Sequence, residues 1–208
     1  MKALLYVLLL SSFCFSAQRP PKVDGLGKFR PGITTVGVID DLARELNVQV
    51  VEQKKYLKES DFEKGKIYKV LYDPNEEKKP NRASKCTQSE VYRLGDYTFS
   101  GVELKDAYLT FYKKVLVAIE CKIPADILEA MPNRYGTPES KKEEREIECS
   151  NGGNRSRENF YIYTWRDGDI EAESVIVPYY DNDCKRDFVR TFTVKAAKEH
   201  SAYIDCGK

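Results

Sequence analysis

The sequence has 208 residues, of which 41% are hydrophobic and 32% are charged, and its 34 basic residues nearly balance its 33 acidic ones. This composition excludes an intrinsically disordered chain, and the formal net charge of +1 lacks the basic excess of a nucleic-acid-binding protein. A single histidine also excludes most metal sites and histidine-based catalytic triads.

Residues 1–17 have the pattern of a secretory signal peptide. Lys2 supplies a positive charge, and residues 3–10 (ALLYVLLL) form a short apolar segment. That segment is shorter than the roughly 20 residues that span a bilayer, and no later segment is longer, so we expect no transmembrane segment. Phe13 stands where lipidation of Cys14 needs a small residue, which argues against a lipoprotein. The sequence therefore predicts a secreted or periplasmic protein.

A polar, Pro-rich leader at residues 18–25 is expected to be flexible. Thr34 and Thr35 then form a helix N-cap signal, and the apolar residues of VGVIDDLAREL recur at the spacing of an amphipathic helix. Asn47 is a suitable residue to end this helix. Strands are predicted at residues 47–53 and 66–73.

The middle of the sequence predicts a loop, strands and a second helix. Residues 74–89 read as a charged loop that leads into a strand at 89–94. The segment 107–122 predicts a hairpin that turns at Lys113-Lys114, because its second arm alternates with period two. Pro124 is well placed to start a helix, which Pro132 would limit or kink and which Gly136 would end.

The last third of the sequence predicts more strands. Residues 141–148 are highly charged, and residues 150–158 read as a loop. Asp167-Gly168 separates two apolar runs and is a strong hairpin signal, and a last strand is expected at 187–195.

These elements predict an α+β fold, with seven to nine antiparallel strands, two helices packed on one side, and disulfide bonds. We expect a single domain over residues 26–208. An alternative is a pair of similar halves at 26–80 and 90–208, since helix–hairpin units are common building blocks.

Five cysteines follow the predicted signal peptide, and disulfide bonds are their expected role in an oxidising compartment. Because five is odd, one is unpaired or joins another chain. Five choices of the unpaired cysteine and three pairings of the other four leave fifteen arrangements open. An acidic residue directly precedes four of them, which disfavours a reactive thiolate. The candidates are Cys86, Cys121, Cys149, Cys184 and Cys206.

Two short segments carry a family resemblance. Residues 29–35 (FRPGITT), followed by the helix pattern, resemble the opening of small envelope proteins of the BamE/SmpA type, and residues 134–138 (RYGTP) are similar to their helix-terminating Gly-x-Pro. The chain departs from that family in its five mature cysteines, its greater length and the lack of a convincing lipidation site. The resemblance implies an envelope scaffold or inhibitor-like domain without chemistry of its own, and it transfers no functional residue.

Motifs for catalysis, metals and cofactors are missing from the sequence. There is no G-x-S-x-G, HExxH, P-loop or G-x-G-x-x-G motif, and nothing marks a catalytic partner for His200. Asp181-Asn182-Asp183 lacks the rest of a calcium-binding loop and predicts a turn. We therefore expect no metal and no cofactor.

Aromatic residues are the most informative side chains. On one strand, Tyr161, Tyr163 and Trp165 share a face, and Tyr179 and Tyr180 follow nearby in the sequence. Tyrosine and tryptophan often anchor interfaces, so these five are candidate binding residues. The alternative, cross-strand packing in the core, stays open.

The leading functional hypothesis is an exported, non-catalytic binding or scaffold protein whose partner is another envelope or extracellular protein. One alternative is an inhibitor or immunity-type protein that blocks an envelope hydrolase, which would need a protruding loop at 74–85 or 150–158. Another is a carboxylate-dependent hydrolase, which would need two acidic residues in one pocket. The sequence predicts no oligomeric state.

Overall fold

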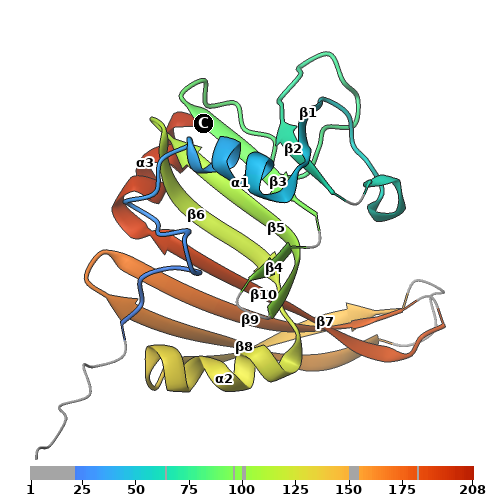
Figure 1. Ribbon diagram of the computed structural model, residues 1–208. Coiled ribbons are helices and arrows are strands. Elements are labelled where there is room, and N and C mark those ends of the chain that lie inside the picture. Colours follow the sequence, from blue (N-terminus) through green and yellow to red (C-terminus); the bar gives the residue numbers. More distant parts are fainter. Residues whose placement is uncertain (1–21, 64, 96, 100–101, 150–154, 182) are drawn as a thin grey trace, which may run out of the picture.

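The computed structural model describes residues 22–208 except residues 64, 96, 100–101, 150–154 and 182 (Figure 1). The predicted signal peptide and the first part of the leader lie outside the described residues. The described residues form one ten-stranded sheet and three α-helices.

The helices are α1 (Val38–Leu46), α2 (Ala125–Tyr135) and α3 (Ala197–Cys206), with a short 3₁₀ helix at Glu59–Asp61. The strands are β1 (Gln49–Gln53), β2 (Lys66–Val70), β3 (Ser89–Leu94), β4 (Tyr97–Phe99), β5 (Val102–Tyr112), β6 (Val115–Lys122), β7 (Glu139–Glu148), β8 (Arg155–Asp167), β9 (Ile170–Tyr180) and β10 (Arg186–Ala196).

Nine strands follow the order β1-β2-β3-β5-β6-β10-β9-β8-β7, and β4 pairs with β5. This order contains two groups of strands, β1 to β6 and β7 to β10, and the strands within each group are near each other in sequence. The groups meet where β6 pairs antiparallel with β10, from Thr191 opposite Lys122 to Lys195 opposite Ala118. This pairing makes one continuous sheet of both groups.

The prediction of a purely antiparallel sheet is wrong for one pair of strands. Gln49–Gln53 and Lys66–Val70 pair in parallel, with Val51 opposite Tyr68. The connection between them is long enough to return the chain to the starting end of β1, as a parallel pair requires. Residue patterns within each strand do not contain this information.

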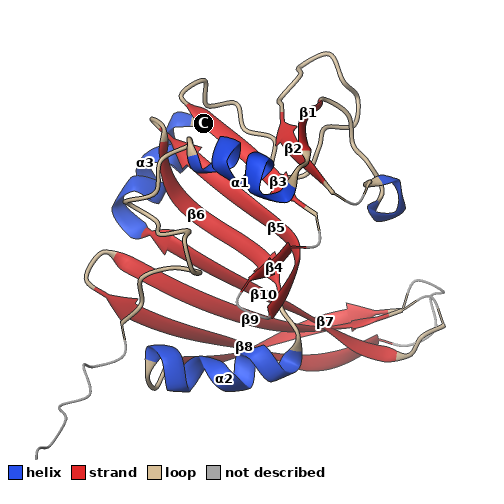
Figure 2. Ribbon diagram, in the orientation of Figure 1, coloured by secondary structure: helices blue, strands red, loops and turns tan. Residues whose placement is uncertain are grey.

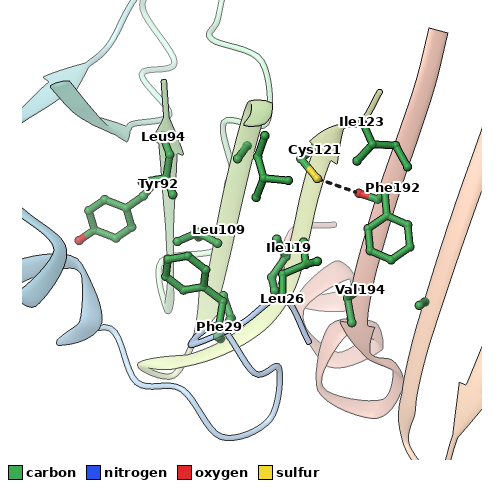
Figure 3. Close-up of a cluster of buried hydrophobic side chains, with 14 of the residues drawn as sticks. Leu26, Phe29, Tyr92, Leu94, Leu109, Ile119, Cys121, Ile123, Phe192 and Val194 are labelled. Carbon is green, nitrogen blue, oxygen red and sulfur yellow. Dashed lines mark hydrogen bonds between the residues drawn. The ribbon is translucent and has the colours of Figure 1, made fainter. Parts of the chain in front are cut away.

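Both predicted helices pack on the same face of the sheet. Figure 1 shows α1 and α2 on the near side, and Ile39 of α1 and Met131 of α2 belong to one buried cluster with Phe192 of β10. Figure 3 shows part of that cluster, in which side chains of β3, β5, β6 and β10 meet Leu26 and Phe29 from the N-terminal segment. Val23, in the predicted leader, is also buried.

Local signals explain where helix α1 ends but not where it begins. Asn47 has a left-handed φ of 52° and caps the helix through its backbone N–H, which confirms the predicted stop. The predicted threonine cap is wrong, because Gly37 occupies the N-cap without a side-chain hydrogen bond. Instead, the Thr34 hydroxyl accepts the Arg30 N–H and donates to the Lys28 carbonyl, closing the preceding turn.

Two further predictions are confirmed at tight turns. Lys113 and Lys114 both have positive φ, 50° and 68°, between the paired residues Tyr112 and Val115, which is the backbone of a type I′ hairpin. Gly168 has φ 61° in the turn that joins β8 to β9. Helix α2 begins after Pro124, continues through Pro132 and ends at Gly136.

The expectation of two helices is corrected by α3, which lies on the other face of the sheet. Five of the ten residues in its sequence, AKEHSAYIDC, are polar or charged, and none of its residues is buried. Tyr203 approaches Tyr112 of β5 with 6.5 Å between ring centroids, and the Ala197 N–H donates to the Asp169 carbonyl. Cys206, the last residue of this helix, forms a disulfide with Cys86.

Strand β7 was not predicted because it lacks the apolar alternation of a half-buried strand. Eight of its ten residues are charged, and nearly all are exposed. β7 pairs only with β8 and so forms an edge of the sheet in the described part of the chain. Charged side chains on an edge strand disfavour pairing with other chains.

The structure selects one of the fifteen cysteine arrangements. Cys86 pairs with Cys206, and Cys149 pairs with Cys184, which joins the end of β7 to the turn between β9 and β10. Cys121 is unpaired and buried, and burial raises the pKa of its thiol to about 12. This thiol is therefore protonated at neutral pH and unsuited to nucleophilic chemistry.

We expect that the Cys86–Cys206 disulfide holds α3 on the sheet, because α3 contributes no buried side chain of its own. The double variant Cys86→Ala/Cys206→Ala should lose about 2–5 kcal/mol of unfolding free energy. Hydrogen exchange should become fast in α3 and stay slow in β5 and β6. The matched control is Cys149→Ala/Cys184→Ala, which should leave exchange in α3 unchanged. Retained protection of α3 in the first variant would show that packing alone holds this helix.

Candidate functional site

Strands β7 to β10 extend beyond the N-terminal end of α2 and form an arm, defined here as residues 143–149, 155–161, 175–181 and 183–190. Figure 2 shows no helix on either side of this arm in the described part of the chain. Cys149–Cys184 joins two of its segments at the far end. A single-layered sheet cannot bury both of its faces by itself, so apolar residues on the arm need cover from elsewhere.

Next to the arm, a cleft of about 250 Å³ opens between α2 and β8. Most of its lining is aromatic or aliphatic, with one carboxylate. The lining residues are Leu128, Glu129, Pro132, Pro138, Tyr163 and Trp165.

Trp165 forms the inner wall of this cleft and is a core residue. It is 3% exposed, and its indole Nε1–H donates to the Gly136 carbonyl over 2.7 Å. Its ring lies 6.1 Å from that of Tyr135 and 6.5 Å from that of Phe192. Trp165 therefore attaches the end of α2 to the sheet.

The five aromatic residues that the sequence singles out do not form one site. Tyr163 lies half-buried in the cleft with Trp165, and Tyr161 is 39% exposed on the same face of β8. Tyr179 is 37% exposed on the opposite face, where its hydroxyl donates to Asp187. The hydroxyl groups of Tyr180 and Ser156 are hydrogen-bonded over 3.0 Å.

Each face of the arm carries apolar side chains. On the face of Tyr161, Ile176 and Phe188 are half-buried, and Arg186 and Arg190 lie over the Phe188 ring at 4.9 and 5.5 Å. The other face has a strip of half-buried apolar residues. They are Phe160, Val175, Val177 and Val189, and Ile162 continues the strip toward the body of the sheet.

Trp165 and Tyr161 should respond differently to substitution. Trp165→Phe removes the hydrogen bond to Gly136 and leaves a small cavity, so it should cost about 1–3 kcal/mol of unfolding free energy. Tyr161→Ala removes a side chain that is well exposed and should cost less than about 1 kcal/mol. Urea unfolding of both variants measures the difference. Equal losses would contradict the assignment of Trp165 to the core and Tyr161 to the surface.

A second hollow, the polar pocket, lies on the face of the sheet opposite α1 and α2. Its volume is about 350 Å³, and a segment of the connection between β2 and β3 forms one wall. Its strand residues, including Glu120 and Lys122, alternate with the core residues Ile119 and Cys121. The lining residues are Asn81, Arg82, Asp106, Tyr108, Glu120, Cys121, Lys122 and Thr191.

Ion pairs organise this pocket. Asp106 has φ 49° at an irregularity in the pairing of β5 with β6, and its carboxylate binds Arg93 as well as Lys122, the latter over 2.5 Å. Arg93 is 5% exposed in its side chain and lies 3.3 Å from the centre of the Phe62 ring. Burial raises the pKa of Asp106, but hydrogen bonds from Lys122 and Arg93 outweigh it and hold that pKa below 3.8. Arg82 binds Glu120.

We expect Asp106 to be essential for the stability of the fold, because its carboxylate neutralises the buried Arg93. Asp106→Asn should cost about 3–5 kcal/mol of unfolding free energy, while Glu120→Gln, at a more exposed pair, should cost less than about 1 kcal/mol. Because the pKa of Asp106 is lower in the folded state, its stabilisation is present above pH 3.8 and is lost as pH falls through the folded-state pKa. Urea unfolding between pH 2 and 7 measures both effects. A flat difference between wild type and Asp106→Asn across this range would contradict them.

Among the residues that the structure describes, no group of three His, Cys, Asp or Glu side chains could hold a metal ion. The Asp181 carboxylate accepts the backbone N–H groups of Asp183 and Lys185, which is the geometry of a turn; Asn182 lies outside the described residues. None of the helices in the described part of the chain is long and apolar enough to cross a membrane.

Sequence reasoning missed the cleft and the polar pocket. In the sequence, Pro132 and Pro138 indicate where a helix is limited or ends, and they do not indicate contact with β8. Asp106 gave no signal, because a polar residue within a strand is usually exposed and nothing local shows that its carboxylate forms an ion pair with Arg93 of β3. Both hollows depend on pairings between distant strands.

The chain matches no protein-family model, no curated protein and no solved structure.

Proposed function

We propose that this protein is an exported, non-catalytic binding protein that holds a partner protein on the Tyr161 face of the arm and in the adjoining cleft. The observation that carries this proposal is a single-layered arm with apolar side chains on both faces. Two disulfides fit the oxidising compartment to which the predicted signal peptide would direct the chain.

The Tyr161 face is favoured over the opposite face because it adjoins a hollow. Tyr161 lies two residues from Tyr163 on the same face of β8, so a partner's apolar side chain could enter the cleft beside Tyr163 while its neighbours contact Tyr161. Phe188, with Arg186 and Arg190 stacked on its ring, extends this surface along the arm. Aromatic residues and arginine are the side chains that most often dominate the binding energy of protein interfaces.

The hydrolase alternative has one observation in its favour, since Asp106 and Glu120 line the same pocket. Acid catalysis by two carboxylates needs one of them protonated at neutral pH, through a raised pKa. The pKa of Asp106 is instead lowered, and Glu120 is paired with Arg82. This pocket therefore supports binding better than hydrolysis.

The inhibitor alternative needs a loop that can enter an enzyme's active site. Within the predicted loop 74–85, the Lys78 carbonyl accepts the Tyr56 N–H, and Arg82 binds Glu120. The first contact joins this segment to the connection between β1 and β2, and the second joins it to β6. In the other predicted loop, residues 150–154 lie outside the described residues and 155–158 belong to β8.

Tyr161 and Tyr179 make a matched pair for testing the proposal, because their exposure is similar and they lie on opposite faces of the arm. Wild type, Tyr161→Ala and Tyr179→Ala would each be crosslinked mildly in the exported fraction of the native source, and captured proteins identified by mass spectrometry. We expect a stoichiometric partner whose affinity falls by about tenfold or more in Tyr161→Ala and is nearly unchanged in Tyr179→Ala.

Two results would contradict the proposal. One is the absence of any partner that depends on the arm, and the other is equal capture by wild type and Tyr161→Ala. Loss of capture in Tyr179→Ala alone would move the binding surface to the opposite face. Inhibition of a captured enzyme by the wild-type protein would favour the inhibitor alternative.

A further inference from the structure

A third hollow, the tyrosine pocket, lies where the connection between β2 and β3 leaves and rejoins the sheet. Its volume is about 330 Å³. Val70 of β2 and Val91 of β3 are paired across the two strands and form its buried floor, since they are only 5% and 1% exposed. The other lining residues are Leu71, Tyr72, Ser84, Lys85, Cys86, Thr87 and Ser89.

Contacts within the fold hold the walls of the tyrosine pocket in place. In the segment that follows β2, the Leu71 N–H donates to the carbonyl of the last residue of β1 over 2.9 Å. In the segment that leads into β3, the Ser84 hydroxyl accepts the Cys86 N–H over 3.2 Å, and the Ser89 hydroxyl donates to the Cys86 carbonyl over 2.7 Å. The disulfide to Cys206 ties the same segment to α3. A hollow with fixed walls lowers the entropic cost of binding a ligand.

The lining of the tyrosine pocket offers donors and one positive charge but no carboxylate. Lys85 is the one charged residue in the lining, and its ammonium group lies 5.8 Å from the centre of the Tyr72 ring. In the part of the chain that the structure describes, no carboxylate forms an ion pair with Lys85. Thr87 adds a hydroxyl group, and the Ser84 hydroxyl can still donate its proton while it accepts the Cys86 N–H.

The acidic residues of the same connection stay outside the lining, which contains neither Asp73 nor Glu76 nor Glu77. The charge of the pocket is therefore that of Lys85 alone. An ammonium group beside hydroxyl donors favours a ligand group that is negatively charged and accepts hydrogen bonds. The valine floor and the Tyr72 ring favour an apolar group in the same ligand.

We infer that the tyrosine pocket binds a small molecule that joins an apolar ring to a carboxylate. The ring would lie on Val70 and Val91 beside Tyr72. The carboxylate would accept hydrogen bonds from Lys85 and Thr87. A volume of about 330 Å³ is near the lower end for small-molecule sites, and an apolar lining with a few placed polar groups is their usual composition. None of the lining residues belongs to the arm or the cleft, so the site is independent of the proposed partner surface.

The experiment is titration calorimetry of the mature protein with probes that separate the ring from the charge. Phenylacetate carries both groups, acetate lacks the ring, 2-phenylethanol lacks the charge, and phenethylamine reverses the charge. We expect phenylacetate to bind about tenfold more tightly than each of the others, because it alone uses both the floor and the ammonium group. Raising the salt concentration should weaken its binding.

Variants locate the binding site. Lys85→Gln should weaken phenylacetate binding by about tenfold, to the level of 2-phenylethanol, and Thr87→Val should weaken it by a few fold. The matched control is Lys78→Gln, which should bind like wild type. Lys78 is an exposed lysine of the same connection and lies over the Tyr56 ring at 3.9 Å, but it does not line the pocket.

Four results would overturn the inference. Phenylacetate could fail to bind, acetate or 2-phenylethanol could bind equally well, phenethylamine could bind in preference, or Lys85→Gln could bind phenylacetate like wild type. Equal weakening by Lys85→Gln and Lys78→Gln would do the same, because the effect would then be one of overall charge. Circular dichroism verifies the folding of each variant, and the comparison of the probes on wild type decides the question even if a variant is unstable.

Discussion

The antiparallel pairing of β6 with β10 is the constraint on which the rest of the structure depends. It places Cys121 opposite Phe192 and Ile119 opposite Val194, at the centre of the sheet and of the buried cluster. Both α1 and α2 pack on this cluster, so one core serves strands that lie before and after α2 in the sequence (Figure 3). Burial of these side chains supplies most of the free energy that offsets the loss of chain entropy.

The same pairing creates the opposite face. Residues that alternate with Ile119 and Cys121 on β6 must point away from the core, and these are Glu120 and Lys122. With Thr191 of β10 and Asp106 of β5 beside them, they form the strand side of the polar pocket. Helix α3 covers another part of this face but contributes no buried residue, so a covalent bond to Cys86 takes the place of packing.

In the arm, strands β7 to β10 extend past the buried core of the protein. Toward Asp167, β8 carries Trp165 beneath the C-terminal end of α2. Toward Arg155, no helix covers β8 in the described part of the chain. Apolar side chains continue along the strands past the limit of the core, and the free energy of burying them is available to a partner. Charged β7 forms the edge of this region, which protects it from unspecific strand pairing.

The sequence by itself determined those features that depend on neighbouring residues. Asn47 ends α1, Lys113-Lys114 and Gly168 turn two hairpins, and Pro124 precedes α2, because each of these depends on backbone preferences of a few residues. Several strand positions followed from apolar alternation, but β7, whose charged residues bury neither face, did not. Strand β4 and the first part of β5 were not predicted either, and residues 155–158 of β8 were predicted as a loop. Only the tertiary structure decided the parallel pairing of β1 with β2, the disulfide partners, the attachment of α3 and the two hollows. Each of these is a contact between residues far apart in sequence, and its free energy depends on which distant groups the whole sheet brings together.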